Sequence, residues 1–324
     1  MALEAATYGI RCDCSGCLCG SVAPPSPPPV PSLPPAPPLP PPISPNPPLV
    51  ATELVTFAEL RRQLADASPG SSLAFTLAPG AVLEIEQSLV IAGISVSISS
   101  VSPGVTIRRA GWAKNSSRIF EVRDAGHLYL SRVSVANGRT SNGEHGGGIL
   151  VEGPGSILTA EFLAVSDCQV LDAGGLSWVS HLGGGIAAID GAELRLHGVQ
   201  VERCLANSGG GIAFLGSLGM LTDCRIADCT SNPRSDQQNG GAGIYIAYRS
   251  IVSWRGGHIV NCSAVGAGAG AGVAAADSTF HMMNAAISGC EASFGGAGFI
   301  FSRLFGDPTA LSIGNLTNVS VSNW

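Results

Sequence analysis

The chain has 324 residues, of which 45% are hydrophobic and only 12% are charged, against a typical charged share of ~25%. Its net charge of −6 does not indicate a nucleic-acid-binding surface, and no nucleic-acid partner is predicted. No apolar run reaches the ~18–20 residues that cross a membrane, so no transmembrane segment is predicted. Residues 1–20 also lack the basic start and apolar centre of a secretory signal.

Residues 1–22 form a cysteine-rich tail with the spacing C-x-C-x-x-C-x-C, made by Cys12, Cys14, Cys17 and Cys19. Thiolates at this spacing can bind zinc or copper(I). The same four cysteines also suit the remnant of an upstream disulfide-rich module. Both alternatives stay open, with the structural one favoured, and we predict no cofactor for the rest of the chain.

Residues 23–48 form a proline-rich linker, which predicts an extended polyproline II spacer. Its phrase Ser26-Pro27-Pro28-Pro29 resembles the linkers of plant and green-algal wall glycoproteins such as pherophorins and extensins. The resemblance implies an extracellular or cell-surface location and a cell-wall glycoprotein or polysaccharide as partner. The alternatives are a plain spacer and a ligand for a proline-binding domain.

A short helix is predicted immediately after the linker. Thr56 and Glu59 form a capping box, and Leu60 and Leu64 lie four residues apart on one face. The predicted helix covers Phe57–Asp66. We expect it to cover the first strands and their edges, which would otherwise pair with other chains.

A glycine tetrad that ends in an apolar residue recurs between residues 146 and 299, beginning at Gly146, Gly183, Gly209, Gly241, Gly270 and Gly296. A second phrase follows each of the first five tetrads. It consists of a β-branched residue, any two residues and then a cysteine, and it ends at Cys168, Cys204, Cys229, Cys262 and Cys290. A period of 26–37 residues indicates a repeat architecture. The segments between these marks alternate apolar and polar residues over three or four positions, which predicts short strands.

These repeats resemble the right-handed parallel β-helix of the pectin-lyase-like superfamily. The glycine phrase is close to the repeat of chlamydial polymorphic outer-membrane proteins, although Val/Ile-x-x-Cys stands here in place of their Phe-x-x-Asn. The resemblance covers about residues 50–324 and implies an all-β fold. We therefore predict that residues 49–324 form a right-handed parallel β-helix solenoid of about nine or ten coils. No helix is predicted to cover the C-terminal coil, and the alternatives there are a fragment of a longer chain, a partner, such as a second copy in end-to-end self-association, or a frayed last coil.

The five repeat cysteines are predicted to point inward as an unbridged column of small, polarizable side chains. The residue before each cysteine should then point outward. Asp167, Arg203 and Asp228 would alternate in charge on neighbouring repeats. This arrangement predicts a neutralising ladder, with the active groups of a polysaccharide lyase or glycoside hydrolase as the alternative.

Insertions before three of the tetrads should project from one edge of the fold, and loops on a rigid scaffold often bind ligands. The candidate ligand-binding residues on this edge are His145, Asp172, Trp178, His181, Arg234 and Asp236. If the chain is secreted, four sequons are available for glycosylation, at Asn115, Asn261, Asn315 and Asn318.

The function predicted from the sequence is a non-catalytic extracellular or cell-surface protein that acts in adhesion or in a matrix and binds carbohydrate. Characteristic catalytic phrases of polygalacturonases and pectate lyases are missing, which favours binding over catalysis. A polysaccharide lyase or hydrolase is the first alternative. An intracellular scaffold is the second.

Overall fold

The computed structural model describes residues 56–102, 104–111, 117–141, 144–171, 181–232, 240–294, 296, 298–302 and 312–322. The chain divides into two units, Met1–Asn46 and Pro47–Trp324, and every described residue belongs to the second unit. The predicted cysteine-rich tail and proline-rich linker therefore lie outside the described residues.

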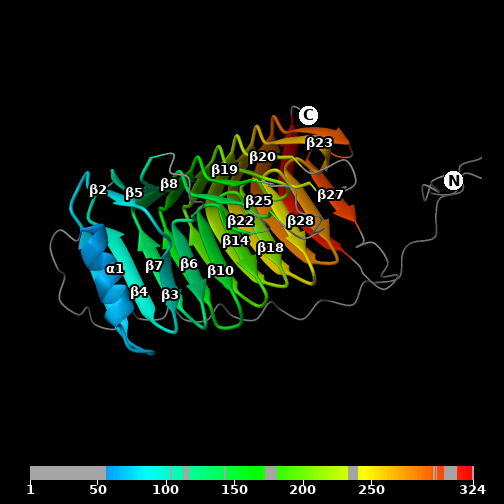
Figure 1. Ribbon diagram of the computed structural model, residues 1–324. Helices are drawn as coiled ribbons and strands as arrows, with labels where there is room; N and C mark the ends of the chain where they lie inside the picture. Colours follow the sequence, from blue (N-terminus) through cyan, green and yellow to red (C-terminus); the bar gives the residue numbers. More distant parts are fainter. Residues whose placement is uncertain are drawn as a thin grey trace, which may run out of the picture. The chain divides into compact units, whose positions relative to one another are not determined.

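The predicted helix is confirmed as α1, Phe57–Asp66. The side chain of Thr56 caps it by accepting a hydrogen bond from the backbone nitrogen of Glu59 at 3.3 Å. Leu60 is only 1% exposed, and the helix packs on β2 (Val82–Ile85) and β3 (Leu89–Ala92). Figure 1 shows α1 beside the first strands.

All named strands pair in parallel, and they form three sheets. The largest has 14 strands: β1 (Ser72–Leu77), β2, β4 (Ser95–Ser100), β5 (Val105–Arg109), β7 (His127–Ser131), β8 (Val133–Ala136), β11 (Ile157–Glu161), β12 (Ala164–Ser166), β15 (Glu193–His197), β16 (Gln200–Glu202), β19 (Leu218–Ala227), β22 (Ile251–Val260), β25 (Thr279–Ser288) and β28 (Ile313–Ser322).

The other two sheets consist of shorter strands. The eight-stranded sheet contains β3, β6 (Phe120–Arg123), β10 (Ile149–Glu152), β14 (Ile186–Ile189), β18 (Ile212–Leu215), β21 (Ile244–Ala247), β24 (Val273–Ala276) and β27 (Phe299–Ser302). The six-stranded sheet contains β9 (Arg139–Ser141), β13 (Gln169–Leu171), β17 (Leu205–Ala206), β20 (Thr230–Ser231), β23 (Ser263–Ala269) and β26 (Glu291–Phe294).

The predicted fold class, a regular β-helix solenoid of nine or ten coils, is wrong. The largest sheet follows a curled path of parallel strands, β1-β4-β7-β11-β15-β19-β16-β12-β8-β5-β2, which turns back at β19. The physical reason is that β19 is a single ten-residue strand that pairs with β15 along one half and with β16 along the other. The strands on both sides of β19 therefore belong to one sheet that resembles half of a barrel.

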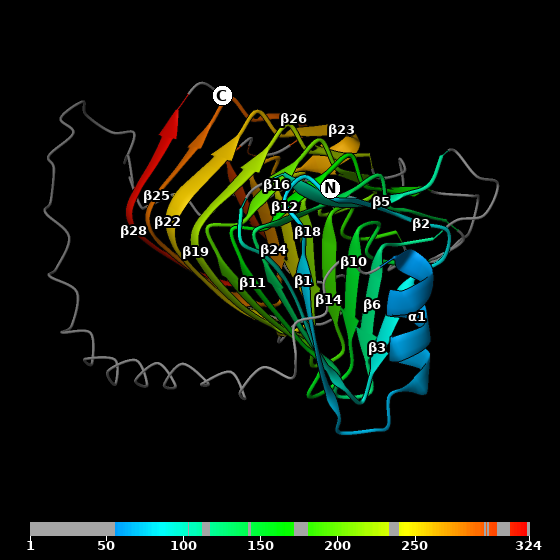
Figure 2. The same ribbon diagram turned by 90° about the vertical axis from the view of Figure 1, so that its left-hand side faces the viewer.

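The curl depends on left-handed backbone conformations within the long strands. Asp223 has φ 52° in β19, Gly256 and Gly257 have φ 72° and 90° in β22, and Asn284 has φ 52° in β25. Each residue bends its strand, while hydrogen bonding to the neighbouring strands continues on both sides of the bend. In Figure 2 the bent strands β19, β22, β25 and β28 lie side by side.

The glycine tetrads lead into the strands of the eight-stranded sheet and pack backbone against backbone. The amide of Gly147 donates to the carbonyl of Gly183, and that of Gly184 to Gly209, both at 3.0 Å. A Cβ atom at Gly184 would lie 2.4 Å from the carbonyl oxygen of Gly210 and 2.5 Å from that of Leu205. The repeated glycines are therefore required by close backbone approach.

The side chains that point between the three sheets form one continuous apolar core. It runs from Leu60 of α1 through aromatic residues such as Phe75, Phe214, Trp254 and Phe280, which are at most 1% exposed. Leu150, Ala187, Ala213 and Tyr245 belong to a second, smaller apolar cluster. No helix among the described residues has the length and apolar character needed to cross a membrane.

Replacing Gly184 by alanine tests the close backbone packing of the tetrads. The new methyl group would push on two carbonyl oxygens of neighbouring strands, so we expect the free energy of unfolding to fall by about 3 kcal/mol, at the upper end of overpacking. Gly80→Ala is the control, because a Cβ there meets nothing within 4 Å and only the positive φ of 71° costs about 1–2 kcal/mol. Urea unfolding measures both, and equal losses would contradict the packing argument.

Candidate functional site

Two columns of side chains meet where the largest sheet turns into the six-stranded sheet. We call Cys168, Cys204, Cys229, Cys262 and Cys290 the thiol column, and Asn137, Asp167, Arg203, Asp228 and Asn261 the outward column. Every residue of the outward column has a positive φ between 51° and 60°. This left-handed conformation turns the chain, so that the residue itself faces solvent and the next side chain enters the core.

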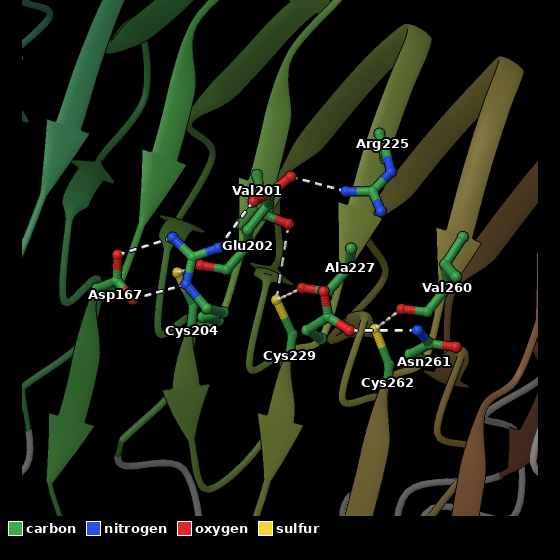
Figure 3. Close-up of polar contacts among 12 residues, drawn as sticks. Asp167, Val201, Glu202, Cys204, Arg225, Ala227, Cys229, Val260, Asn261 and Cys262 are labelled. Atoms are coloured by element: carbon green, nitrogen blue, oxygen red, sulfur yellow. Dashed lines mark hydrogen bonds and ion pairs between the residues drawn. The ribbon is translucent and has the colours of Figure 1, made fainter.

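The thiol column is buried, because each cysteine is at most 1% exposed, and none of the five forms a disulfide in the described part of the chain. Each sulfur hydrogen-bonds to the carbonyl oxygen two residues earlier, at 3.2 Å for Cys168, Cys204 and Cys229, 3.6 Å for Cys262 and 3.7 Å for Cys290. Figure 3 shows these bonds for Cys229 and Cys262. The repeated contact gives every buried thiol a backbone partner.

Cys224 obeys the same rule at the other bend of the chain. It follows Asp223, whose φ is positive, and its sulfur contacts the carbonyl oxygens of Thr222 at 3.4 Å and Leu196 at 3.6 Å. Its apparent departure from the one-per-repeat pattern therefore reflects a different bend. Burial raises the pKa of Cys224 to about 11. Burial also raises the pKa of Cys204, and the hydrogen bond with Cys204 raises that of Cys229, so these thiols are poor nucleophiles.

The outward column is held together by charge and hydrogen bonds. Arg203 donates from Nε to Oδ1 of Asp167 at 2.8 Å and from a terminal nitrogen to Oδ2 at 2.9 Å. Asn261 donates to Asp228 at 3.3 Å. Figure 3 shows both contacts. The bidentate pair lowers the pKa of Asp167 and raises that of Arg203. Asp167 is thus held as a carboxylate by a neighbouring guanidinium.

A second ion-pair network lies beside the outward column. Glu202 accepts from Arg203 at 2.9 Å and from Arg225 at 2.7 Å. Asp228 accepts a hydrogen bond from Asn261, whereas Arg203 donates to Asp167 and Glu202. The three predicted residues Asp167, Arg203 and Asp228 therefore do not converge on one point. The arrangement favours the neutralising ladder.

A groove of about 780 Å³ opens beside the first part of the outward column. Its lining comes from five successive repeats and consists of Glu84, Arg108, Arg109, Gly111, Asn137, Arg139, Asp167, Cys168, Gln169, Arg203 and Leu205. Four arginines and two acids give this lining a formal charge of +2, although the whole chain carries −6. The groove is therefore a positively charged region on an acidic protein.

Both acids of the groove form ion pairs with its own arginines. Arg108 donates to Glu84 at 2.6 and 3.2 Å, and Arg203 binds Asp167 as described above. Arg109, at the end of β5, is only 5% exposed, and its pKa is lowered by burial and by the positive charge of Arg139. The guanidinium groups of Arg109 and Arg139 thus repel each other within the groove.

Sequence reasoning missed Arg108, Arg109 and Arg139 as site residues. The signal was weak because Arg109 and Arg139 lie 30 residues apart and belong to different strands, β5 and β9. Only the tertiary structure brings the end of one and the start of the other to the same groove.

The predicted loop edge is described only in part. Asp172, Trp178, Arg234 and Asp236 lie outside the described residues. His181 is 1% exposed, and it lies close enough to His145 for its charge to lower the pKa of that residue. Arg118, 8% exposed, lies at the same edge and pairs with Glu121 at 2.7 Å and Glu144 at 3.0 Å.

The pKa of His145, at this edge, is lowered by its surroundings. Burial, followed by the charges of Arg118 and His181, lowers its pKa to about 4, while Asp190 acts in the opposite direction. Its Nδ1 is buried and has no hydrogen-bond partner in the described part of the chain. His145 is therefore neutral at physiological pH.

The remaining predicted sites fall into two groups. Cys12, Cys14, Cys17, Cys19 and Asn115 lie outside the described residues. Asn261, Asn315 and Asn318 are exposed. Within the described ranges, no cluster of three or more histidine, cysteine, aspartate or glutamate side chains could hold a metal ion.

Comparisons with models of protein families, with curated proteins and with solved structures find no match to this chain.

The buried thiols predict a clear result with an aromatic disulfide reagent. In the full-length protein with Cys12, Cys14, Cys17 and Cys19 replaced by serine, we expect no reaction in the folded state and release of six equivalents after unfolding. Burial keeps the folded thiols from attacking, and the raised pKa values of Cys204, Cys224 and Cys229 act in the same direction. Absorbance of the released thiolate measures this, and reaction of any equivalent at the rate of an exposed thiol would contradict it.

The low pKa of the partly buried His145 predicts that the folded protein loses stability in acid. Because the folded-state pKa of about 4 lies below the unfolded value of ~6.5, the unfolded state binds more protons between these values. Stability should therefore be constant above about pH 7 and fall as the pH drops to about 4, by about 3 kcal/mol from His145. His145→Asn should remove this part of the slope in urea unfolding, whereas His258→Asn, at an exposed position, should leave it unchanged.

Proposed function

We propose that this chain is a non-catalytic extracellular or cell-surface protein that binds an acidic polysaccharide in the groove. The ligand's carboxylate or sulfate groups would contact the arginines. The groove spans five parallel repeats, about 19 Å at the ~4.8 Å strand spacing, which suits a short stretch of an extended chain.

Charge is the first support for this proposal. Guanidinium groups bind carboxylates and sulfates through paired hydrogen bonds, and Arg is always charged at physiological pH. The lining carries a charge of +2 in a chain of −6, so the groove would attract an anionic ligand that the rest of the surface repels. Asn137 and Gln169 add amide groups that can bond to hydroxyls.

The main observation in favour of a non-catalytic function is the bidentate ion pair of Arg203 with Asp167. Glycoside hydrolysis needs one carboxyl group as an acid and a second as a base or nucleophile. Both groove acids, Asp167 and Glu84, are already paired with arginines. Such a pair lowers the pKa of Asp167, which opposes its use as a general acid.

The extracellular location is supported by the proline-rich linker of residues 23–48 and by the exposure of three sequon asparagines, Asn261, Asn315 and Asn318. The described thiols are buried in the core and need no disulfide partner for their packing. An oxidising environment is compatible with such protected cysteines.

The test is binding of the full chain to polygalacturonate, with a neutral galactan as the control polymer. We expect binding to the acidic polymer without release of unsaturated or reducing ends. Arg109→Gln and Arg139→Gln should each weaken affinity about tenfold, the loss of one charge-assisted contact. Arg249→Gln, whose side chain is 82% exposed outside the groove, is the matched control and should bind normally.

Two outcomes would contradict the proposal. Release of new chain ends that is lost in Asp167→Asn would identify an enzyme. Equal affinity of the Arg109, Arg139 and Arg249 variants would show that the groove is not the binding site.

A further inference from the structure

Strand β28 presents core positions to solvent. It pairs with β25 on one side, and among the described residues no strand lies on its other side. Leu316 and Val321 of β28 are 42% and 39% exposed. Their partners in β25, Met282 and Ile287, occupy the same inward positions and are each 1% exposed. The apolar core therefore reaches an open surface at β28.

The exposed edge also lacks the usual protection against strand pairing. Ile313–Ser322 contains no charged residue and no proline, the two common means of blocking an edge. The opposite side of the fold differs, because α1 packs there on β2 and β3 and presents Arg62 and Asp66 to solvent. In the described part of the chain, the β28 edge is thus open to another strand.

The inward and outward positions of β28 follow from its register with β25. Gly314 and Leu316 pair with the buried Phe280 and Met282, so they point inward. Val319 and Val321 pair with the buried Ala285 and Ile287 and also point inward. The inward positions are even-numbered before Asn318 and odd-numbered after it, because the positive φ of Asn318, 50°, bends the strand there.

This pattern makes the edge complementary to itself. A two-fold axis between residues 317 and 318 places Leu316 opposite Val319 of a second copy, and Gly314 opposite Val321. Side chains directly opposite in an antiparallel pair share one face. Inward residues therefore meet inward residues in both halves, and the outward Asn315 meets the outward Ser320.

We propose that the protein forms a two-fold symmetric dimer in which the β28 strands of two copies pair antiparallel, with residue 316 opposite residue 319. The pairing continues the β25–β28 ladder across the axis and brings no like charges together. Leu316, Val319 and Val321 of each copy would become covered. The dimer does not depend on the groove or on its ligand.

A closed dimer is favoured over a growing chain of molecules. Head-to-tail stacking would require β28 to meet the opposite side of the fold, where α1 packs on β2 and β3. A two-fold contact uses the same surface on both copies and leaves no further edge of β28 to extend.

The first test is the molar mass of the full chain, produced in a host without N-glycosylation because Asn315 begins a sequon. Light scattering should give twice 32.8 kDa at high concentration and dissociation on dilution. Leu316→Arg should give a monomer with an unchanged circular dichroism spectrum. Ser253→Arg, at an exposed position of β22 that is paired on both sides, should remain a dimer.

The second test fixes the register, in a background with the four tail cysteines replaced by serine. A mixture of Asn315→Cys and Ser320→Cys chains should form a disulfide-linked heterodimer on mild oxidation. A mixture of Asn315→Cys and Ile313→Cys chains should not, because these residues are not opposite each other. A monomer at every concentration, masses that keep growing with concentration, or equal cross-linking of both mixtures would each overturn the proposal.

Discussion

The left-handed backbone conformation at the bends is the constraint on which the rest of this structure depends. It occurs at equivalent positions of successive repeats, in residues as different as Asp167, Arg203 and Asn261. Non-glycine residues adopt it at a cost of about 1–2 kcal/mol each, so hydrogen bonding along the stacked strands must compensate. Each bend sends one side chain outward and the next into the core, which creates the outward column and the thiol column together.

The two columns explain why the site is electrostatic rather than nucleophilic. The inward residues are thiols that bond to carbonyl oxygens and have little access to water. The outward residues are charged, and parallel stacking places Arg203 beside Asp167 although 36 residues separate them. Where the ladder reaches the first repeats, arginines outnumber acids and the groove becomes positive. The positive charge of the groove is thus a consequence of how the repeats stack.

Much of the local structure followed from short-range patterns. Thr56 and Glu59 predicted the bounds of α1, because capping and amphipathic spacing act within one or two turns. The glycine tetrads and the Val/Ile-x-x-Cys phrases marked where strands begin and bend, because close backbone approach tolerates few residues. Buried cysteines and exposed preceding residues were likewise expected from alternation alone.

The sequence by itself thus determined the helix, the short parallel strands and the direction of most side chains, since these depend on neighbours along the chain. Tertiary structure decided whether adjacent strands fuse, and the unbroken β19 pairs with both β15 and β16 and so joins them in one curled sheet. It also decided the groove, because Arg109 and Arg139 come together only through the register of strands from different repeats. Register depends on the sum of many weak contacts across the core, and a linear pattern does not contain that sum.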